Sequence, residues 1–244
     1  MKLKDILILS AVSIVFLGAL VGCSSGDDDD DTPGPVAEIF NGTFVTSTGS
    51  IGTVEFVRVS PATSVATALL AAMVDVSGSV TPVGGASVVV SGTIDNEAGF
   101  FQASGGGYAL NGFFDAGLIG GDISGTSGSG VFAALGSNSG TAQTYCGDWT
   151  ESSQSMPAGL FTLTVEGNSA VAGVVDFADS AAFLLLNNSV SGNSVSLAAY
   201  PKQDNPLQAT GTLSGGSVSG TWTSTDGGVS ISGTWQGTTQ GCIN

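Results

Sequence analysis

The chain has 244 residues, of which 42% are hydrophobic and only 10% charged, and it contains 38 glycines and no histidine. Its formal net charge is −16, and Arg58 and Lys202 are the only cations beyond the first four residues. A nucleic-acid-binding role is excluded, because it needs many Lys and Arg side chains to displace the counterions of phosphates. The lack of histidine removes the commonest general base and the commonest neutral metal ligand.

Residues 1–22 are predicted to form a lipoprotein signal peptide. Two lysines precede an apolar run over residues 6–20, whose length suits a signal-peptide core and is short for a membrane-spanning helix. The run ends in Leu20-Val21-Gly22-Cys23, which resembles the lipobox of bacterial lipoproteins. The resemblance implies that the leader is cleaved before Cys23 and that acyl chains on Cys23 hold the protein at a membrane. The alternative is an uncleaved anchor helix with an incidental cysteine.

Residues 23–38 are predicted to form the lipidated cysteine and an acidic, disordered linker. Five consecutive aspartates from Asp27 to Asp31 repel one another, and the prolines that follow stiffen the chain. Ser24 with this acidic run resembles the sorting and surface-export signals of Gram-negative lipoproteins. The resemblance implies a lipid-anchored protein of the outer membrane, and it leaves open whether the protein faces the periplasm or the cell surface.

From about residue 39 the chain is predicted to be all-β, because short apolar runs alternate with turn residues. Over 217–223 and 229–235, apolar residues or glycines alternate with Ser and Thr, so one face of each strand is buried and the other is wet. An internal repeat predicts two tandem antiparallel meanders, 39–140 and 141–244, each a barrel or sandwich of about eight strands. One larger sandwich is the alternative.

Two local patterns need separate interpretation. Residues 61–73 combine an early proline with Ala, Leu and Met, which favours a short helix or helical turn over a buried strand. In Phe100-Phe101 and Phe113-Phe114, one ring of each adjacent pair should point out of the sheet. We expect it to pack at an edge or between the units, and the alternative is an exposed surface for a partner.

The two remaining cysteines are predicted to form a disulfide. Cys146 lies on the first predicted strand of the second unit and Cys242 follows its last. First and last strands can be neighbours in a closed barrel, and an exported protein occupies a compartment where a disulfide survives. Two free thiols are the alternative. With no histidine and no further cysteines, we expect neither a zinc site nor another metal or cofactor.

No catalytic motif is present, so the chain is expected not to be an enzyme. A Ser-His-Asp triad is impossible without histidine. Carboxylate pairs alone suffice for glycoside hydrolysis, although turn aspartates that cap their own backbone are far commoner. The candidate pairs are Asp115 with Asp122, Asp148 with Glu151, and Asp176 with Asp179.

The tryptophans are the remaining ligand candidates. The Gly-Thr-Trp strands at 220–222 and 233–235 resemble those of avidin-like and lipocalin-like barrels, and no ligand residue carries over from either family. Trp149, Trp222 and Trp235 are expected to fill the core of the second unit. In a closed barrel they could instead line a pocket.

Together these features predict a non-enzymatic, membrane-anchored lipoprotein with an adhesion, envelope or binding role. The alternatives are a small-ligand carrier that uses a barrel interior and a secreted carboxylate-dependent hydrolase. The partner is left open among an extracellular protein, a glycan and a small apolar ligand, and the oligomeric state is left open too.

Replacing Cys23 by alanine should abolish incorporation of labelled palmitate and leave the leader attached, because the thiol is the acylation site. Intact-protein mass spectrometry of the membrane fraction measures both effects, and Ser24→Ala serves as a control that keeps the thiol. An unmodified Cys23 on an intact leader in the native protein would refute the lipid anchor.

Overall fold

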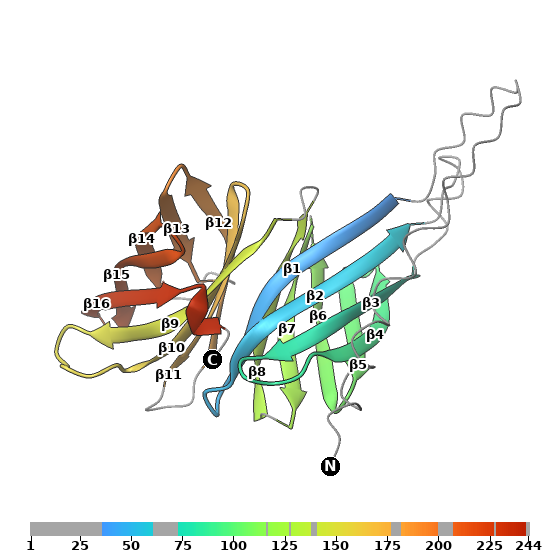
Figure 1. Cartoon of the computed structure of the whole chain (residues 1–244), viewed down its shortest axis with the longest axis horizontal. Coiled ribbons are helices and arrows are strands. Elements are labelled where there is room, and N and C mark those ends of the chain that lie inside the picture. The colour runs from blue at the N-terminus through green and yellow to red at the C-terminus, as the bar shows by residue number, and fades with distance from the viewer. Residues whose placement is uncertain are drawn as a thin grey trace, which may run out of the picture. The chain divides into compact units, whose positions relative to one another are not determined.

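A computed structural model shows two closed antiparallel β-barrels of eight strands each, joined in tandem (Figure 1). It describes residues 36–60, 73–115, 117–126, 128–137, 141–176, 182–199, 207–226 and 228–242. The predicted signal peptide, most of the predicted linker and residues 61–72 of the predicted helical stretch lie outside the described residues. Met73, the last residue of that stretch, begins a strand.

The first barrel follows the chain without a crossover. Each strand pairs with the next, and the last closes on the first. Gly106 and Gly107 join the fifth strand to the sixth with φ values of 55° and 87°, the backbone that a two-residue type I′ turn requires. The strands are β1 (Val36–Thr46), β2 (Ile51–Ser60), β3 (Met73–Pro82), β4 (Val88–Asp95), β5 (Phe100–Gly105), β6 (Tyr108–Asp115), β7 (Leu118–Gly125) and β8 (Gly128–Ser137).

The second barrel repeats this plan, and its last strand closes on β9. The prediction of two tandem all-β units, each with about eight strands, is therefore confirmed, and both units are closed barrels. The strands are β9 (Gln143–Glu151), β10 (Gly159–Glu166), β11 (Ser169–Asp176), β12 (Ala182–Ser191), β13 (Ser194–Ala198), β14 (Gln208–Ser214), β15 (Ser217–Asp226) and β16 (Val229–Thr238), followed by the short 3-10 helix η1 (Gln240–Cys242).

Aromatic rings fill the first barrel by lying over glycines that face inward. A methyl group added at Gly78 would lie 2.7 Å from Cδ1 of Phe56, and one at Gly52 would lie 2.5 Å from Cε1 of Phe44. The Phe56 ring also packs edge-on against Phe101, with 4.9 Å between centroids. An aromatic ring over a glycine on the neighbouring strand is a known way to fill a small, curved sheet. These rings belong to one continuous core.

The same device fills the second barrel with tryptophan. A methyl group at Gly211 would lie 2.5 Å from Cζ2 of Trp235, and one at Gly233 would lie 2.6 Å from Nε1 of Trp222. Trp222 Nε1 donates a hydrogen bond to the Thr150 carbonyl at 3.3 Å, so the buried indole N–H has an acceptor. Trp235 makes an equivalent bond to another strand. The expectation that the tryptophans fill the second core agrees with the burial of Trp222 and Trp235, and the partly buried Trp149 packs against the same core.

The barrels pack against each other mainly through β1 and β8 on one side and β10, β11 and β12 on the other, with smaller contributions from β2, β7 and β9. Val45, Ala133 and Val171 are fully buried there. Gly173 makes the close approach possible, because a methyl group on it would lie 3.1 Å from Cγ2 of Val45. At the edge of this contact, Asn41 Nδ2 donates to Glu166 Oε2 at 3.5 Å. We call this contact the inter-barrel interface.

The adjacent phenylalanines divide as the alternation predicts. Phe101 is fully buried in the first core, whereas its neighbour Phe100 is 43% exposed. Phe114 packs against the same core, and Phe113 packs against the buried Leu135 and Val171 of the inter-barrel interface. The expected packing between units is thus confirmed for Phe113.

Cys146 on β9 and Cys242 in η1 form a disulfide, with 5.0 Å between their Cα atoms. The prediction is confirmed because β9 and β16 are neighbours in the closed barrel, where Cys146 pairs in register with Thr238. Both cysteines also join a cluster with Val45 and Ile51 of the first barrel.

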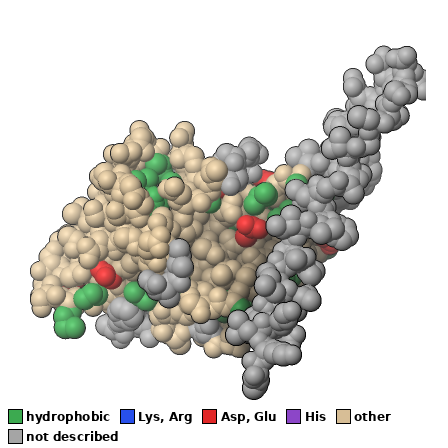
Figure 2. Space-filling model, viewed as in Figure 1, with side chains coloured by type: hydrophobic (Ala, Val, Ile, Leu, Met, Phe, Trp, Pro, Cys, Tyr) green, Lys and Arg blue, Asp and Glu red, His purple; other side chains and the backbone are tan. Residues whose placement is uncertain are grey.

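The outer faces of the strands carry mainly Ser, Thr and other uncharged polar groups. Figure 2 shows one face of the molecule, on which charged side chains are few and hydrophobic ones gather in small patches. Arg58 is the only cation within the described ranges.

Cys146→Ser combined with Cys242→Ser should lower the free energy of unfolding. The disulfide closes a loop with a sequence separation of 96, and chain entropy for such a loop predicts a loss of about 4–5 kcal/mol. Urea unfolding monitored by tryptophan fluorescence measures the change. As a control, reductant should destabilise the wild type and leave the double variant unchanged. A reductant-insensitive wild type would contradict the prediction.

Candidate functional site

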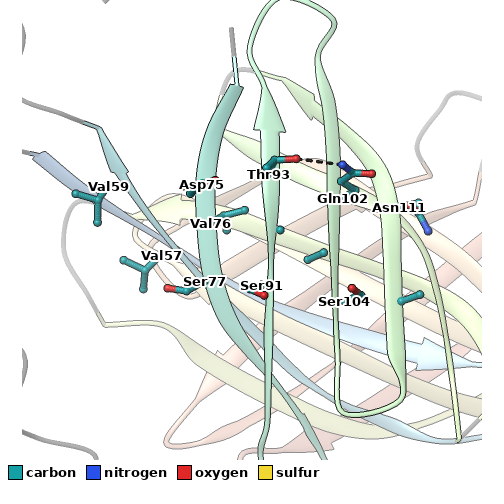
Figure 3. Close-up of a pocket in the computed structure, with 13 residues that line it drawn as sticks. Val57, Val59, Asp75, Val76, Ser77, Ser91, Thr93, Gln102, Ser104 and Asn111 are labelled. Carbon is teal, nitrogen blue, oxygen red and sulfur yellow. Dashed lines mark hydrogen bonds between the residues drawn. The ribbon is translucent and has the colours of Figure 1, made fainter. Parts of the chain in front are cut away.

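The hollow regions described here lie on the outer faces of the barrels. A groove of about 870 Å³ runs over the outer face of β2 to β6, and we call it the first-barrel groove (Figure 3). Outward-facing side chains, which occupy every second position of each strand, form its walls. The backbone of the inward-facing residues between them forms its floor. The lining residues are Val57, Val59, Asp75, Val76, Ser77, Ser91, Gly92, Thr93, Gln102, Ala103, Ser104, Ala109 and Asn111.

At the floor of the groove, two small inward-facing residues allow neighbouring strands to curve toward the barrel interior. Gly92 on β4 and Ala103 on β5 are register partners. A methyl group at Gly92 would overlap the carbonyl oxygen of Gln102 and lie 2.5 Å from Cα of Ala103. No residue with a Cβ fits this backbone without a shift, so the curvature of the groove depends on glycine at this position.

Polar side chains cross the groove in two rows set by strand register. The alternation that buries Val76, Val90, Phe101 and Leu110 turns their sequence neighbours outward. The upper row contains the carboxylate and both amides, and the lower row contains three serine hydroxyls. The rows are Asp75, Thr93, Gln102 and Asn111, and Ser77, Ser91, Ser104 and Ala109.

The upper row presents hydrogen-bonding groups from rigid strands. Gln102 Nε2 donates to Thr93 Oγ1 at 3.2 Å, which orients the amide along the groove (Figure 3). Gln102 and Asn111 each carry a carbonyl acceptor and an NH₂ donor, whereas an ionised Asp75 carries acceptors only. Val59, which is 52% exposed, adds an apolar wall. This mixture suits a polar ligand with some apolar surface, and the described lining residues include no cation that would bind an anionic ligand.

The predicted carboxylate pairs do not assemble where the structure describes them. Asp122 pairs in register with Asn111 and Asp115 with Leu118. Four residues along the strand therefore separate the two acids, about 13 Å at 3.3 Å per residue. Asp148 and Glu151 are three positions apart on β9, so they point to opposite faces of the strand.

Glu151 instead orders the turn that follows its strand. It accepts hydrogen bonds from Ser153 Oγ at 2.7 Å and Gln154 Nε2 at 3.2 Å. The predicted pair of Asp176 and Asp179 stays a prediction, because Asp179 and the side chain of Asp176 lie outside the described residues. Within the described ranges, His, Cys, Asp and Glu form no cluster of three that could hold a metal ion.

Trp222 and Trp235 are buried in the core of the second barrel, and the partly buried Trp149 packs against that core. Trp149 meets Trp222 edge-on with 5.2 Å between ring centroids, and Trp235 meets Phe161 at the same separation. Burial raises the pKa of the nearby Tyr145 phenol, whose hydroxyl donates to Gln143 Oε1 at 2.8 Å. A ligand role for these tryptophans stays a prediction.

Arg58 stabilises the first barrel internally. Its guanidinium lies 5.3 Å from the centre of the Phe114 ring, and its Nη1 is 3.7 Å from Oε2 of Glu38, its register partner on β1. The cation already has an acidic and an aromatic neighbour, so we do not assign it to the groove.

Sequence reasoning did not identify the residues of the first-barrel groove. A usable signal was the polar series Asp75, Ser77, Ser91, Thr93, Gln102 and Ser104, which alternates with buried apolar residues. Such alternation predicts an outer face, but it does not show that the face is concave.

Comparisons with known protein families, with curated proteins and with solved structures found no match. In the part of the chain that the structure describes, no helix is both long enough and apolar enough to cross a membrane.

Gly92→Ala should destabilise the first barrel by about 1–3 kcal/mol, the usual cost of forcing an extra methyl group into packed structure. Chemical denaturation measures the loss. Ser91→Ala, on the exposed side of the same strand, is the matched control and should change stability by less than about 0.5 kcal/mol. Equal stability of the two variants would show that the floor of the groove does not need glycine.

Proposed function

We propose that this chain is a non-enzymatic lipoprotein of the bacterial cell envelope, anchored by lipid on Cys23, which binds uncharged glycan chains through the first-barrel groove. The leader and the Leu20-to-Cys23 motif support export and lipid attachment. Ser24 and the acidic run after it support the outer membrane, with the barrels facing the cell surface. A membrane contact through basic residues is unsuited to a chain of net charge −16.

The glycan assignment depends mainly on the row Asp75, Thr93, Gln102 and Asn111. A carboxylate and two planar amides on neighbouring strands offer several donors and acceptors at fixed spacing, as adjacent sugar hydroxyls require. Val57, Val59 and Ala109 line the same groove and offer apolar contact to the C–H faces of a sugar ring. Hydrogen bonding and apolar contact are thus available together in one groove.

The other partner classes fit this surface less well. A small apolar ligand needs an enclosed apolar cavity, whereas continuous side-chain clusters occupy the described interiors of both barrels. A protein partner is usually held by buried aromatic or arginine anchors, and neither kind is among the lining residues that the structure describes. An anionic polymer would be repelled by Asp75 and by the overall charge.

Asp75→Ala combined with Gln102→Ala, the groove variant, should weaken glycan binding at least tenfold. A hydrogen bond to the charged Asp75 is worth about 1.5–3 kcal/mol and one to the neutral Gln102 amide about 0.5–1.5 kcal/mol, and about 1.4 kcal/mol corresponds to a tenfold change. Affinity electrophoresis of the full chain in gels containing dextran, mannan, galactan or hydroxyethyl cellulose measures the binding.

The matched control is Glu55→Ala combined with Ser79→Ala. These outward-facing register partners on β2 and β3 lie outside the groove and also remove one carboxylate and one polar group. The control should retain wild-type retardation. The proposal fails if none of the four polysaccharides retards the wild type, or if both double variants lose binding equally.

A further inference from the structure

The second barrel carries an ordered array of hydroxyl groups on the outer face of β12 to β16 and β9. One cross-strand row contains six hydroxyl side chains in mutual register: Ser189, Ser196, Thr210, Thr221, Thr234 and Thr150. A second row beside it contains Ser191, Ser194, Thr212, Ser219, Gln236 and Asp148. We call these two rows the hydroxyl lattice.

The lattice follows from strict alternation in the strands. Ala209, Val218, Trp222 and Trp235 are buried in the core, and the Ser and Thr residues between them must therefore face outward. Neighbouring strands set hydroxyls about 4.8 Å apart, and alternate residues of a strand set them about 6.7 Å apart. Because closed-barrel strands hold the backbone, the spacing is fixed before any ligand arrives.

Part of the hydroxyl lattice lies in a groove, where hydroxyl groups remain available for a ligand. A groove of about 420 Å³ lies over β12 to β15 and is lined by eight Ser and Thr residues together with Val195, Gly211 and Gly220. In the part of the chain that the structure describes, the side-chain oxygens of Ser196, Thr210 and Thr221 make no hydrogen bond to another protein group. No charged side chain is among the residues of this lining that are described.

The central strands of each groove lie across the barrel from the main strands of the inter-barrel interface, whereas β12 at one border of the second groove and β2 at one border of the first also contact the other barrel. In the second barrel the interface uses β10 and β11, which are four strands away from β14 and β15 in the ring of eight. In the first barrel it uses β1 and β8, which are four strands away from β5 and β4. Packing of one barrel on the other therefore leaves the central strands of the grooves uncovered, β4 and β5 in the first barrel and β14 and β15 in the second.

We propose that the hydroxyl lattice is a second binding site, for an uncharged polysaccharide chain lying across the strands, so that one protein chain has two such sites. The inference shares its ligand class with the proposed function but depends on different residues. Hydroxyls both donate and accept hydrogen bonds, so a row of them matches a polymer with the same repeating groups. The described lining of the groove carries no charge, and Asp148 at the end of the second row disfavours an anionic partner.

The test replaces Thr210, Thr221 and Thr234 by valine, which removes three hydroxyls of one row while nearly preserving side-chain shape. With two sites a polymer binds by avidity, so the loss of one site should reduce retardation by dextran, mannan, galactan or hydroxyethyl cellulose at least tenfold. The full chain is used throughout, and near-ultraviolet circular dichroism of the core tryptophans verifies folding.

Two control variants isolate the hydroxyls. Replacing the same three threonines by serine keeps the hydroxyl groups and should keep wild-type retardation. Thr53→Val combined with Thr81→Val changes two register partners of the first barrel outside its groove and should have no effect.

The outcomes separate the two proposals. Unchanged retardation of the valine variant overturns the lattice site, even if the groove variant loses binding. Loss in the valine variant with an unchanged groove variant supports the lattice and contradicts the first-barrel groove. Loss in both supports two sites, and absence of retardation in the wild type overturns both.

Discussion

An eight-stranded barrel encloses little more room than its own side chains fill, and this chain fills that room by placing aromatic rings over inward-facing glycines. Phe56 over Gly78 and Trp235 over Gly211 are examples from the two barrels. The pairing explains why so glycine-rich a sequence needs few aromatic residues to build two cores. It also lets the strands bend sharply, because a glycine brings no Cβ into the neighbouring backbone.

Side-chain clusters occupy the described interiors of both barrels, and the grooves lie on the outer faces. Strand alternation sends every second side chain outward, and in this chain most of those are hydroxyls, amides or acids. Where the inward positions hold glycine or alanine, as at Gly92 and Ala103, the sheet sinks and the outer face becomes a groove. The same residues that shape the core therefore shape the surface on which a ligand would lie.

The inter-barrel interface gives the two barrels different surfaces within one plan. β1, β8, β10 and β11 carry apolar or small outward residues, such as Val45, Ala133 and Val171, and bury them against each other. The strands across each ring keep polar outer faces and remain available. The disulfide links η1 to β9 beside the inter-barrel interface. It therefore holds η1, which follows the last strand, next to that interface.

The sequence by itself determined the all-β class, the two tandem units of about eight strands and the burial of Trp222 and Trp235, because alternation and turn chemistry are local. The pairing of Cys146 with Cys242 could be predicted only by assuming a closed barrel, since the neighbouring strands β9 and β16 bring the two cysteines together. The leader, the lipid on Cys23 and the tether are also sequence-based expectations and remain proposals. The tertiary structure decided that both units close into barrels and that Phe113 packs between them. It also brought Asp75, Gln102 and Asn111 into one row, and it separated Asp115 from Asp122. These outcomes depend on register and curvature between strands distant along the chain, and alternation within a single strand contains no information on either.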